Sequence, residues 1–271
     1  MTFVLHHASV GNAAAPRVAL VLHGVFGSGS NFRSLMKSLA AERPEWRFVL
    51  VDLRLHGRSL DAPPPHTLAA CAQDLAELTR SLALSPAAVI GHSFGGKVAL
   101  TFAEQPPASL QQVWVLDSYP GAHTPGDDHE VIRVLRTLEA VGRDFDTREA
   151  FVDALIERDL SLGIANWLSQ NLVRESERYW FRLDLPAVSE LLADYFRRDL
   201  WPVVEHPPPN LEVHLVVAER SRRLDDEARA RLGARADQRQ VHRYTLPDAG
   251  HWLHVDNPTG LVALLRDGLA K

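Results

Sequence analysis

GHSFGG, residues 91–96, lies between an apolar run (AAVI, 87–90) and a segment of helix-forming composition (KVALTFA, 97–103). A strand, the pattern G-x-S-x-G and a helix, in that order, form the setting in which a serine becomes a nucleophile. The sharp turn needs backbone dihedrals that few residues tolerate, and its glycines leave room for neighbouring chain. Ser93 is therefore predicted to project from the edge of a sheet, beside the free N–H groups of a helix N-terminus.

A candidate general base lies near the C-terminus, in the sequence LPDAGHW at residues 246–252. His251 follows an alternating apolar segment and a Pro-Asp-x-Gly turn, which predicts a loop after one of the last strands. An imidazole there can remove the serine proton and later return it to the leaving group. The chain has 13 histidines, and position and chain order single out His251 as the base.

A candidate oxyanion site lies in VALVLHGVFGS, residues 18–28, which reads as an apolar strand ending in His-Gly and a small, turn-rich loop. Backbone N–H groups suit a developing oxyanion because they are fixed before the reaction starts. Losing one such donor costs about 3 to 4 kcal/mol of transition-state stabilisation. We assign one N–H to Phe94 and the other to Val25, with Phe26 as the near alternative. His23 is interpreted as a brace for this loop.

Five blocks of the chain, taken in order, resemble the α/β-hydrolase superfamily along nearly the whole length. They read HGVFGS (23–28), DLRLHGRS (52–59), GHSFGGK (91–97), LDSYPG (116–121) and GHWLHVDNP (250–258). Within the superfamily, the chain is most similar to a small esterase-like group that includes abhydrolase-domain protein eleven, its plant relatives and short bacterial esterases. The resemblance implies an α/β fold with a mostly parallel central sheet and flanking helices, a serine nucleophile, no metal or other cofactor, and hydrolysis of an ester or thioester.

The acid departs from the commoner pattern of these relatives. Most carry an aspartate after the strand that precedes the strand of the histidine; here that strand reads LEVHLVV (211–217), and the usual position holds Ser221. Asp117 is the predicted replacement, because it ends the strand that follows the nucleophile strand in sequence, and neighbouring strands lie about 4.8 Å apart. Asp225 and Asp226, just beyond the vacant position, are the alternative acids. Asp117 would then only cap a turn.

The middle of the chain changes character. Over residues 118–209 strand-like alternation fades and amphipathic helical spacing takes over, as in 129–141. The proline-rich sequence HPPPN at 206–210 ends this block. We predict a core of residues 1–117 and 210–271, with residues 118–209 inserted as a helical cap.

Aromatic side chains in and near the cap favour an apolar acyl pocket beneath it. The candidate lining residues are Phe26, His92, Trp167, Trp180 and Trp252. The alternative for each ring is that it joins the cap to the core.

Composition agrees with one α/β domain that carries a cap. The chain has 271 residues, of which 46% are apolar, enough to bury a full core. A net charge of −5 without a long basic run gives no footprint for nucleic acid. One cysteine, Cys71, excludes an internal disulfide and suits the cytoplasm or another reducing compartment. No stretch resembles a signal peptide or a membrane span, and no residue grouping has the spacing of metal ligands.

The predicted reaction is acyl transfer in two steps, with a small-molecule ester or thioester as the partner. His251 deprotonates Ser93, which attacks the carbonyl of a small to medium acyl group, and water then releases the acid from the acyl-enzyme. Two other classes of function stay open on the same fold. One is a non-hydrolytic lyase or cofactor-free peroxidase, and the other is a receptor that binds a small molecule and turns it over slowly.

Overall fold

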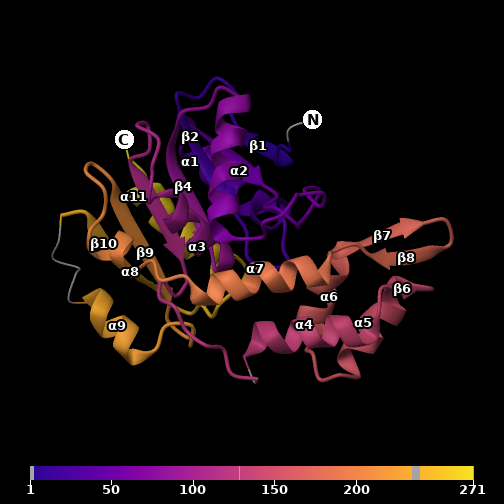
Figure 1. The fold of residues 1–271 in the computed structure, drawn as a ribbon. Helices are drawn as coiled ribbons and strands as arrows, with labels where there is room; N and C mark the ends of the chain where they lie inside the picture. Colours follow the sequence, from indigo (N-terminus) through magenta and orange to yellow (C-terminus); the bar gives the residue numbers. More distant parts are fainter. Residues whose placement is uncertain (1–2, 128, 234–238, 271) are drawn as a thin grey trace.

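The computed structural model describes residues 3–127, 129–233 and 239–270, and its centre is a seven-stranded sheet (Figure 1). The strand order is β1-β3-β2-β4-β5-β9-β10, with β1 antiparallel to β3 and every other pair parallel. The predicted mostly parallel α/β architecture is confirmed. The strands are β1 His7–Gly11, β2 Arg17–Leu22, β3 Trp46–Val51, β4 Pro86–His92, β5 Gln112–Leu116, β9 Glu212–Ala218 and β10 Val241–Leu246.

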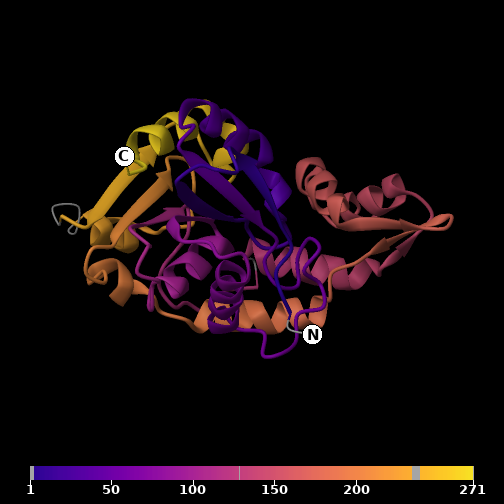
Figure 2. The ribbon, with the colours of Figure 1, turned by 90° about the horizontal axis from the view of Figure 1, so that it is seen from above.

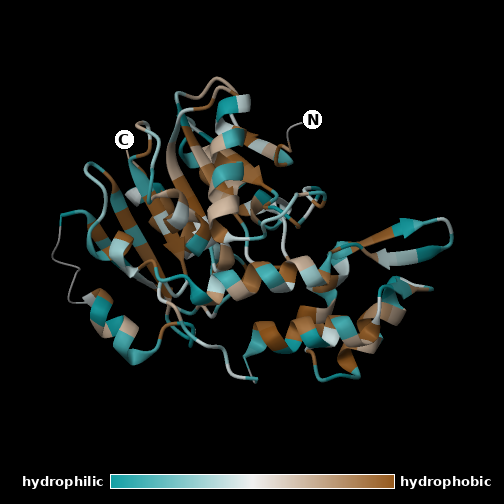
Figure 3. Ribbon diagram, in the orientation of Figure 1, coloured by the Kyte–Doolittle hydropathy of each residue, from teal (hydrophilic) through white to brown (hydrophobic). Residues whose placement is uncertain are grey.

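The inner strands read as continuous apolar runs because helices cover both faces of the sheet (Figures 2 and 3). One face packs against α1 and α11, and the other against α2 and α3. Within the described residues, no helix has both the length and the apolar character needed to cross a bilayer. The core helices are η1 Gly29–Phe32, α1 Arg33–Glu42, α2 Leu68–Ser81, α3 Phe94–Phe102, α9 Asp226–Gly233, α10 Leu253–Asp256 and α11 Pro258–Gly268.

Residues 118–209 leave the sheet after β5 and return to it at β9. Figures 1 and 2 show that α4, α5, α6 and β6–β8 extend from the core as an arm, whereas α7 runs along the core. The arm also contains a three-stranded antiparallel sheet, β6-β8-β7, which the sequence analysis did not predict. The elements are α4 Glu130–Val141, β6 Asp144–Phe145, α5 Arg148–Ile156, α6 Leu162–Leu168, η2 Ser169–Asn171, β7 Leu172–Glu175, β8 Arg178–Phe181, α7 Leu185–Arg197 and α8 Trp201–Glu205.

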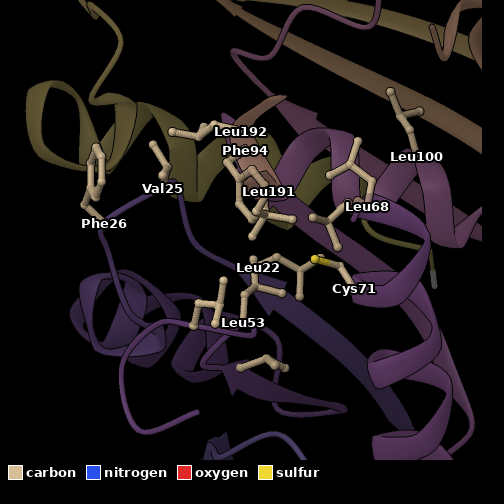
Figure 4. Packing of buried hydrophobic residues seen from close by; sticks show 14 of the residues in the cluster. Leu22, Val25, Phe26, Leu53, Leu68, Cys71, Phe94, Leu100, Leu191 and Leu192 are labelled. Carbon is tan, nitrogen blue, oxygen red and sulfur yellow. The ribbon is translucent and has the colours of Figure 1, made fainter. Parts of the chain in front are cut away.

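Helix α7 attaches the cap to the core through apolar packing. Leu191 and Leu192 belong to the same apolar cluster as Phe94 of α3 and Leu68 of α2 (Figure 4). Cys71 lies in the same cluster and is fully buried, so burial raises the pKa of its thiol. Its surroundings are those of a small buried hydrophobe rather than of a reactive thiol.

Lys97 adds a polar clamp between the core and the cap. Its buried Nζ donates hydrogen bonds to the backbone carbonyls of Gly121, Tyr195 and Arg198, at 2.7, 2.7 and 2.8 Å. Gly121 lies where the chain enters the cap, and the other two carbonyls lie at the end of α7. One ammonium group on α3 therefore ties the start of the cap to the end of α7, which no pattern in the sequence indicated.

Candidate active site

Ser93 occupies the sharp turn between β4 and α3. Its backbone has φ 53° and ψ −115°, a conformation that costs energy in a residue other than glycine and is typical of functional sites. Close packing explains the flanking glycines: a Cβ on Gly91 would lie 2.1 Å from the carbonyl oxygen of Gly95. A Cβ on Gly95 would lie 2.6 Å from the carbonyl oxygen of His23. The Ser93 N–H donates to the Leu116 carbonyl at 3.0 Å, which ties the turn to β5.

The structure brings the three predicted triad side chains into one hydrogen-bonded row. Ser93 Oγ lies 3.1 Å from His251 Nε2, and His251 Nδ1 lies 2.8 Å from Asp117 Oδ2. Asp117 is 1% exposed and follows β5, the strand that pairs with β4. This geometry can move a proton from the hydroxyl to the imidazole while the carboxylate stabilises the imidazolium.

The Asp117 carboxylate is held from the neighbouring strand. Its Oδ1 accepts the Ala218 N–H at 3.2 Å, and its Oδ2 accepts the Ser221 hydroxyl at 2.5 Å. The Asp117 N–H in turn donates to the Val216 carbonyl at 2.8 Å. Ser221, at the position where the sequence resemblance places the usual acid, thus donates a hydrogen bond to the carboxylate that contacts His251.

The two alternative acids point elsewhere. Asp225 accepts the N–H of Ala228 at 2.7 Å and so caps the start of α9. Asp226 lies in the first turn of that helix, and both carboxylates are exposed. Within the described residues, neither is hydrogen-bonded to His251, so the local geometry favours Asp117 as the acid.

The predicted oxyanion loop lies between β2 and η1. Among the described residues, the backbone N–H groups of Val25 and Phe94 donate to no other protein group, which leaves both available to a substrate oxygen. Phe26, the near alternative, has φ 63°, and its carbonyl accepts a hydrogen bond of 2.8 Å from the buried amide of Asn171. Asn171 belongs to the cap, so sequence patterns near the loop could not have revealed this support.

His23 braces the same loop, as the sequence analysis expected. Its Nδ1 donates to the Gly24 carbonyl at 2.7 Å, and its Nε2 accepts the Leu53 N–H at 3.0 Å. The ring is fully buried, and burial lowers its pKa, which favours the neutral form. Both ring nitrogens are engaged in hydrogen bonds to the backbone, so neither is left for proton transfer.

An apolar cavity opens beside Ser93, under the cap. Four of the five candidate pocket residues line it, namely Phe26, His92, Trp167 and Trp252. Trp167 makes edge-on contacts with Phe26 and Trp252, with ring centroids 6.5 and 4.6 Å apart. These rings join the cap to the core and also line the cavity. The prediction of a pocket and its alternative, packing between cap and core, therefore both apply to them.

Trp180 corrects one part of that prediction. Its indole is 41% exposed on β8 of the arm, and it does not line the cavity beside Ser93. A tryptophan in an amphipathic segment suggests that its ring packs against the core. Trp180 instead lies on a β-hairpin, which the sequence did not predict.

His92, next to the nucleophile, has a second role besides lining the cavity. Its Nε2–H donates to the backbone carbonyl of His251 at 2.8 Å. Burial, together with the neighbouring His251 and His254 rings, holds its pKa well below the usual range. A neutral His92 therefore anchors the loop that carries His251.

A second histidine cluster lies at the opposite ends of the strands. Glu212, His214 and His242 bring one ligand atom each within 4.8 Å of one another, which spacing along the chain did not predict because two strands contribute. His214 Nε2 already contacts Glu212 Oε2 at 3.2 Å. The rings of His214 and His242 stack, with centroids 4.5 Å apart and 21° between their planes. Stacking and hydrogen bonding account for this cluster.

Comparison with known proteins identifies the family of the chain. A family model described as "Alpha/beta hydrolase family" matches residues 19–264. The chain is 30% identical over 265 residues to "sn-1-specific diacylglycerol lipase ABHD11" of Mus musculus, across 96% of this chain and 83% of that protein. It is 23% identical over 247 residues to "Esterase YbfF" of Escherichia coli (strain K12), across 91% of each.

A solved structure titled "Marine microorganism esterase" has the same fold. It aligns with a TM-score of 0.84 and 22% identity over 99% of this chain and 100% of that chain. The family resemblance drawn from the five sequence blocks is confirmed. The chain belongs to the alpha/beta hydrolase family.

Proposed function

We propose that this protein is a serine hydrolase that cleaves a carboxylic ester or thioester of a small to medium acyl group. The observation that carries the proposal is the hydrogen-bonded row Ser93–His251–Asp117, with distances of 3.1 and 2.8 Å. A hydrolase of the carboxylesterase type is also supported by the lipase and esterase relatives.

In the first step, His251 Nε2 takes the proton of Ser93 as its oxygen attacks the substrate carbonyl. The N–H groups of Val25 and Phe94 receive the negative charge that develops on the carbonyl oxygen. Asp117 keeps the His251 ring in the tautomer that leaves Nε2 free to accept, and stabilises the imidazolium. The imidazolium then protonates the departing alcohol or thiol.

In the second step, water replaces the leaving group. His251 removes a proton from the water, which attacks the acyl-enzyme, and the same N–H groups again hold the oxyanion. Ser93 recovers its proton as the carboxylic acid leaves. The apolar walls of the cavity, including Phe26 and Trp167, suit an uncharged acyl chain better than a charged one.

The proposal is tested by labelling with a fluorophosphonate probe, which reacts with activated serines. We expect stoichiometric labelling of the folded protein and none in Ser93→Ala. Hydrolysis of p-nitrophenyl esters of increasing acyl length should be abolished by the same substitution. Full turnover by Ser93→Ala, or an unlabelled wild-type protein, would contradict the proposal.

A further inference from the structure

A second pocket opens beside His251, on the side of the loop that follows β9. His251 lines it, whereas Ser93 does not. The imidazole must protonate the departing group, so a space that meets the imidazole but not the nucleophile suits the leaving group rather than the acyl chain. The pocket is lined by Tyr119, His123, His129, Glu130, Arg220, Ser221, Arg222, Arg223, Asp225 and His251.

The charges of this pocket favour an anion. It holds three guanidinium groups against two carboxylates, those of Glu130 and Asp225. The guanidinium of Arg220 already donates to the backbone carbonyl of Asp248. Asp225 is engaged at the start of α9, where it accepts the Ala228 N–H at 2.7 Å. Arg222 is exposed at the rim. The apolar cavity on the other side of Ser93 also has Arg223 and Glu130 at its margin.

Arg223 lines three adjoining cavities near Ser93. It lines the apolar cavity, the second pocket and a cleft next to the N–H groups of Val25 and Phe94. Its side chain is 21% exposed and forms an ion pair with Glu130, the first residue of α4. The Glu130 carboxylate is 47% exposed, so water competes for it and an incoming anion can replace it.

The backbone of Arg223 is fixed relative to the triad. Its N–H donates to Ser221 Oγ at 3.2 Å, and the same hydroxyl donates to Asp117 Oδ2 at 2.5 Å. Because Asp117 supplies the carboxylate, the loop after β9 does not have to carry the acid. Arginines flank Ser221 in this loop. Two hydrogen bonds set the position of this loop against the catalytic row.

We propose that Arg223, with Arg222 and Arg220 around it, binds a carboxylate or phosphate on the leaving group of the ester. The proposal rests on the hydrolase function above and adds the chemical class of the leaving group. A guanidinium recognises both oxyanions through paired, charge-assisted hydrogen bonds. The anion takes the place of Glu130 as the partner of Arg223, so the cap exchanges one ion pair for another when substrate binds.

The test compares three acetate esters of para-substituted phenols, two with an anionic and one with a neutral leaving group. These are 4-acetoxybenzoate, 4-acetoxyphenyl phosphate and the neutral methyl 4-acetoxybenzoate. In Arg223→Gln we expect kcat/KM to fall about tenfold or more for the two anionic esters and to stay within about twofold for the neutral one. Arg223→Lys should recover part of the loss. Arg266→Gln, on the far helix α11, serves as the matched control and should change none of the three.

Removing the competing carboxylate should have the opposite effect. Glu130→Gln is expected to raise kcat/KM for both anionic esters and to leave the neutral ester unchanged. An equal loss on charged and neutral esters in Arg223→Gln would overturn the proposal, because it would mean that Arg223 only holds the cap. A larger loss on p-nitrophenyl hemisuccinate, whose charge lies on the acyl side, would overturn it as well.

A binding measurement separates this proposal from the hydrolase function. Calorimetry with 4-hydroxybenzoate, the product that leaves, needs no turnover and can be done on the Ser93→Ala background. We expect Arg223→Gln to weaken this binding about tenfold or more. Binding that Arg223→Gln leaves unchanged would contradict the anion site. Absence of ester turnover and of serine labelling in the wild type would contradict the hydrolase instead.

Discussion

Ser221 Oγ lies 2.5 Å from Asp117 Oδ2, so the residue at the usual acid position and the residue that contacts the imidazole share one hydrogen bond. Ser221 lies three residues after β9 and Asp117 directly follows β5, and the C-terminal ends of these neighbouring parallel strands meet at the same edge of the sheet. A carboxylate at either strand end can therefore reach nearly the same point. In this protein the carboxylate at that point is Asp117, whose Oδ2 lies 2.8 Å from His251 Nδ1.

Replacing Asp117 should reveal the acid directly. Asp117→Asn keeps the shape but removes the charge that fixes the tautomer of His251, so kcat on p-nitrophenyl acetate should fall about 10⁴-fold. Asp225→Asn keeps a side chain that can cap α9 and should retain kcat within about twofold. Loss of activity in Asp225→Asn alone would assign the acid to the loop after β9.

Moving the acid back should restore part of the activity. Because the two side chains are in hydrogen-bond contact, we expect the double variant Asp117→Asn/Ser221→Asp to recover at least about tenfold in kcat over Asp117→Asn. Asp117→Asn/Ser221→Asn, which adds the same volume without the charge, is the matched control and should recover nothing. Equal activity of the two double variants would mean that Ser221 does not stand where a working acid could.

Two tryptophans of the cap provide a matched pair for the acyl pocket. Trp167 walls the cavity beside Ser93, whereas Trp180 is exposed on β8. Trp167→Ala should enlarge the cavity and shift the preferred p-nitrophenyl ester to a longer acyl chain. Trp180→Ala should leave the acyl-length profile unchanged. Matching profiles for both variants would place the acyl chain outside this cavity.

Two histidines, the buried His56 and the half-buried His254, should make the protein sensitive to acid. Burial lowers the pKa of His56 to about 3 and that of His254 to about 4, below the 6.5 of an exposed histidine. Below pH 6.5 the unfolded chain binds protons that the folded chain does not, so the free energy of unfolding falls as pH drops. From pH 7 to 5, His254 alone should contribute a loss of about 1 to 2 kcal/mol.

Urea unfolding of wild type and His254→Phe at pH 7 and pH 5 measures this contribution. The variant keeps a ring that can stack on Phe32, whose centroid lies 4.5 Å from that of His254 in the wild type. We expect the variant to lose less unfolding free energy than wild type between the two pH values. An identical loss in both proteins would show that His254 titrates normally in the folded state.

Features set by local sequence were predictable. The turn at Ser93 and the apolar strand before it follow from composition within a few residues, and the order of the blocks identified the family. Neighbouring strands follow from connectivity, which was enough to bring Asp117 towards His251.

Features set by contacts between distant segments were not predictable. Lys97 is one charged residue in an apolar helix, and its three carbonyl partners come from both ends of the cap. Asn171 reaches the oxyanion loop across 145 positions. The hairpin that carries Trp180 consists of strands of four residues with charged ends, too short for their alternation to stand out. The contacts of Lys97 and Asn171 depend on which distant segments the fold brings together, so the sequence around each residue does not predict them.

Acylation of Ser93 is measured most directly by rapid-quench mass spectrometry. Protein mixed with p-nitrophenyl acetate and quenched in acid should carry one acetyl group, mapped by peptide sequencing to Ser93, and should release one equivalent of p-nitrophenolate in a burst. Ser93→Ala should show neither signal. An acetyl group on another residue, or full turnover in Ser93→Ala, would contradict the assignment of Ser93 as the nucleophile.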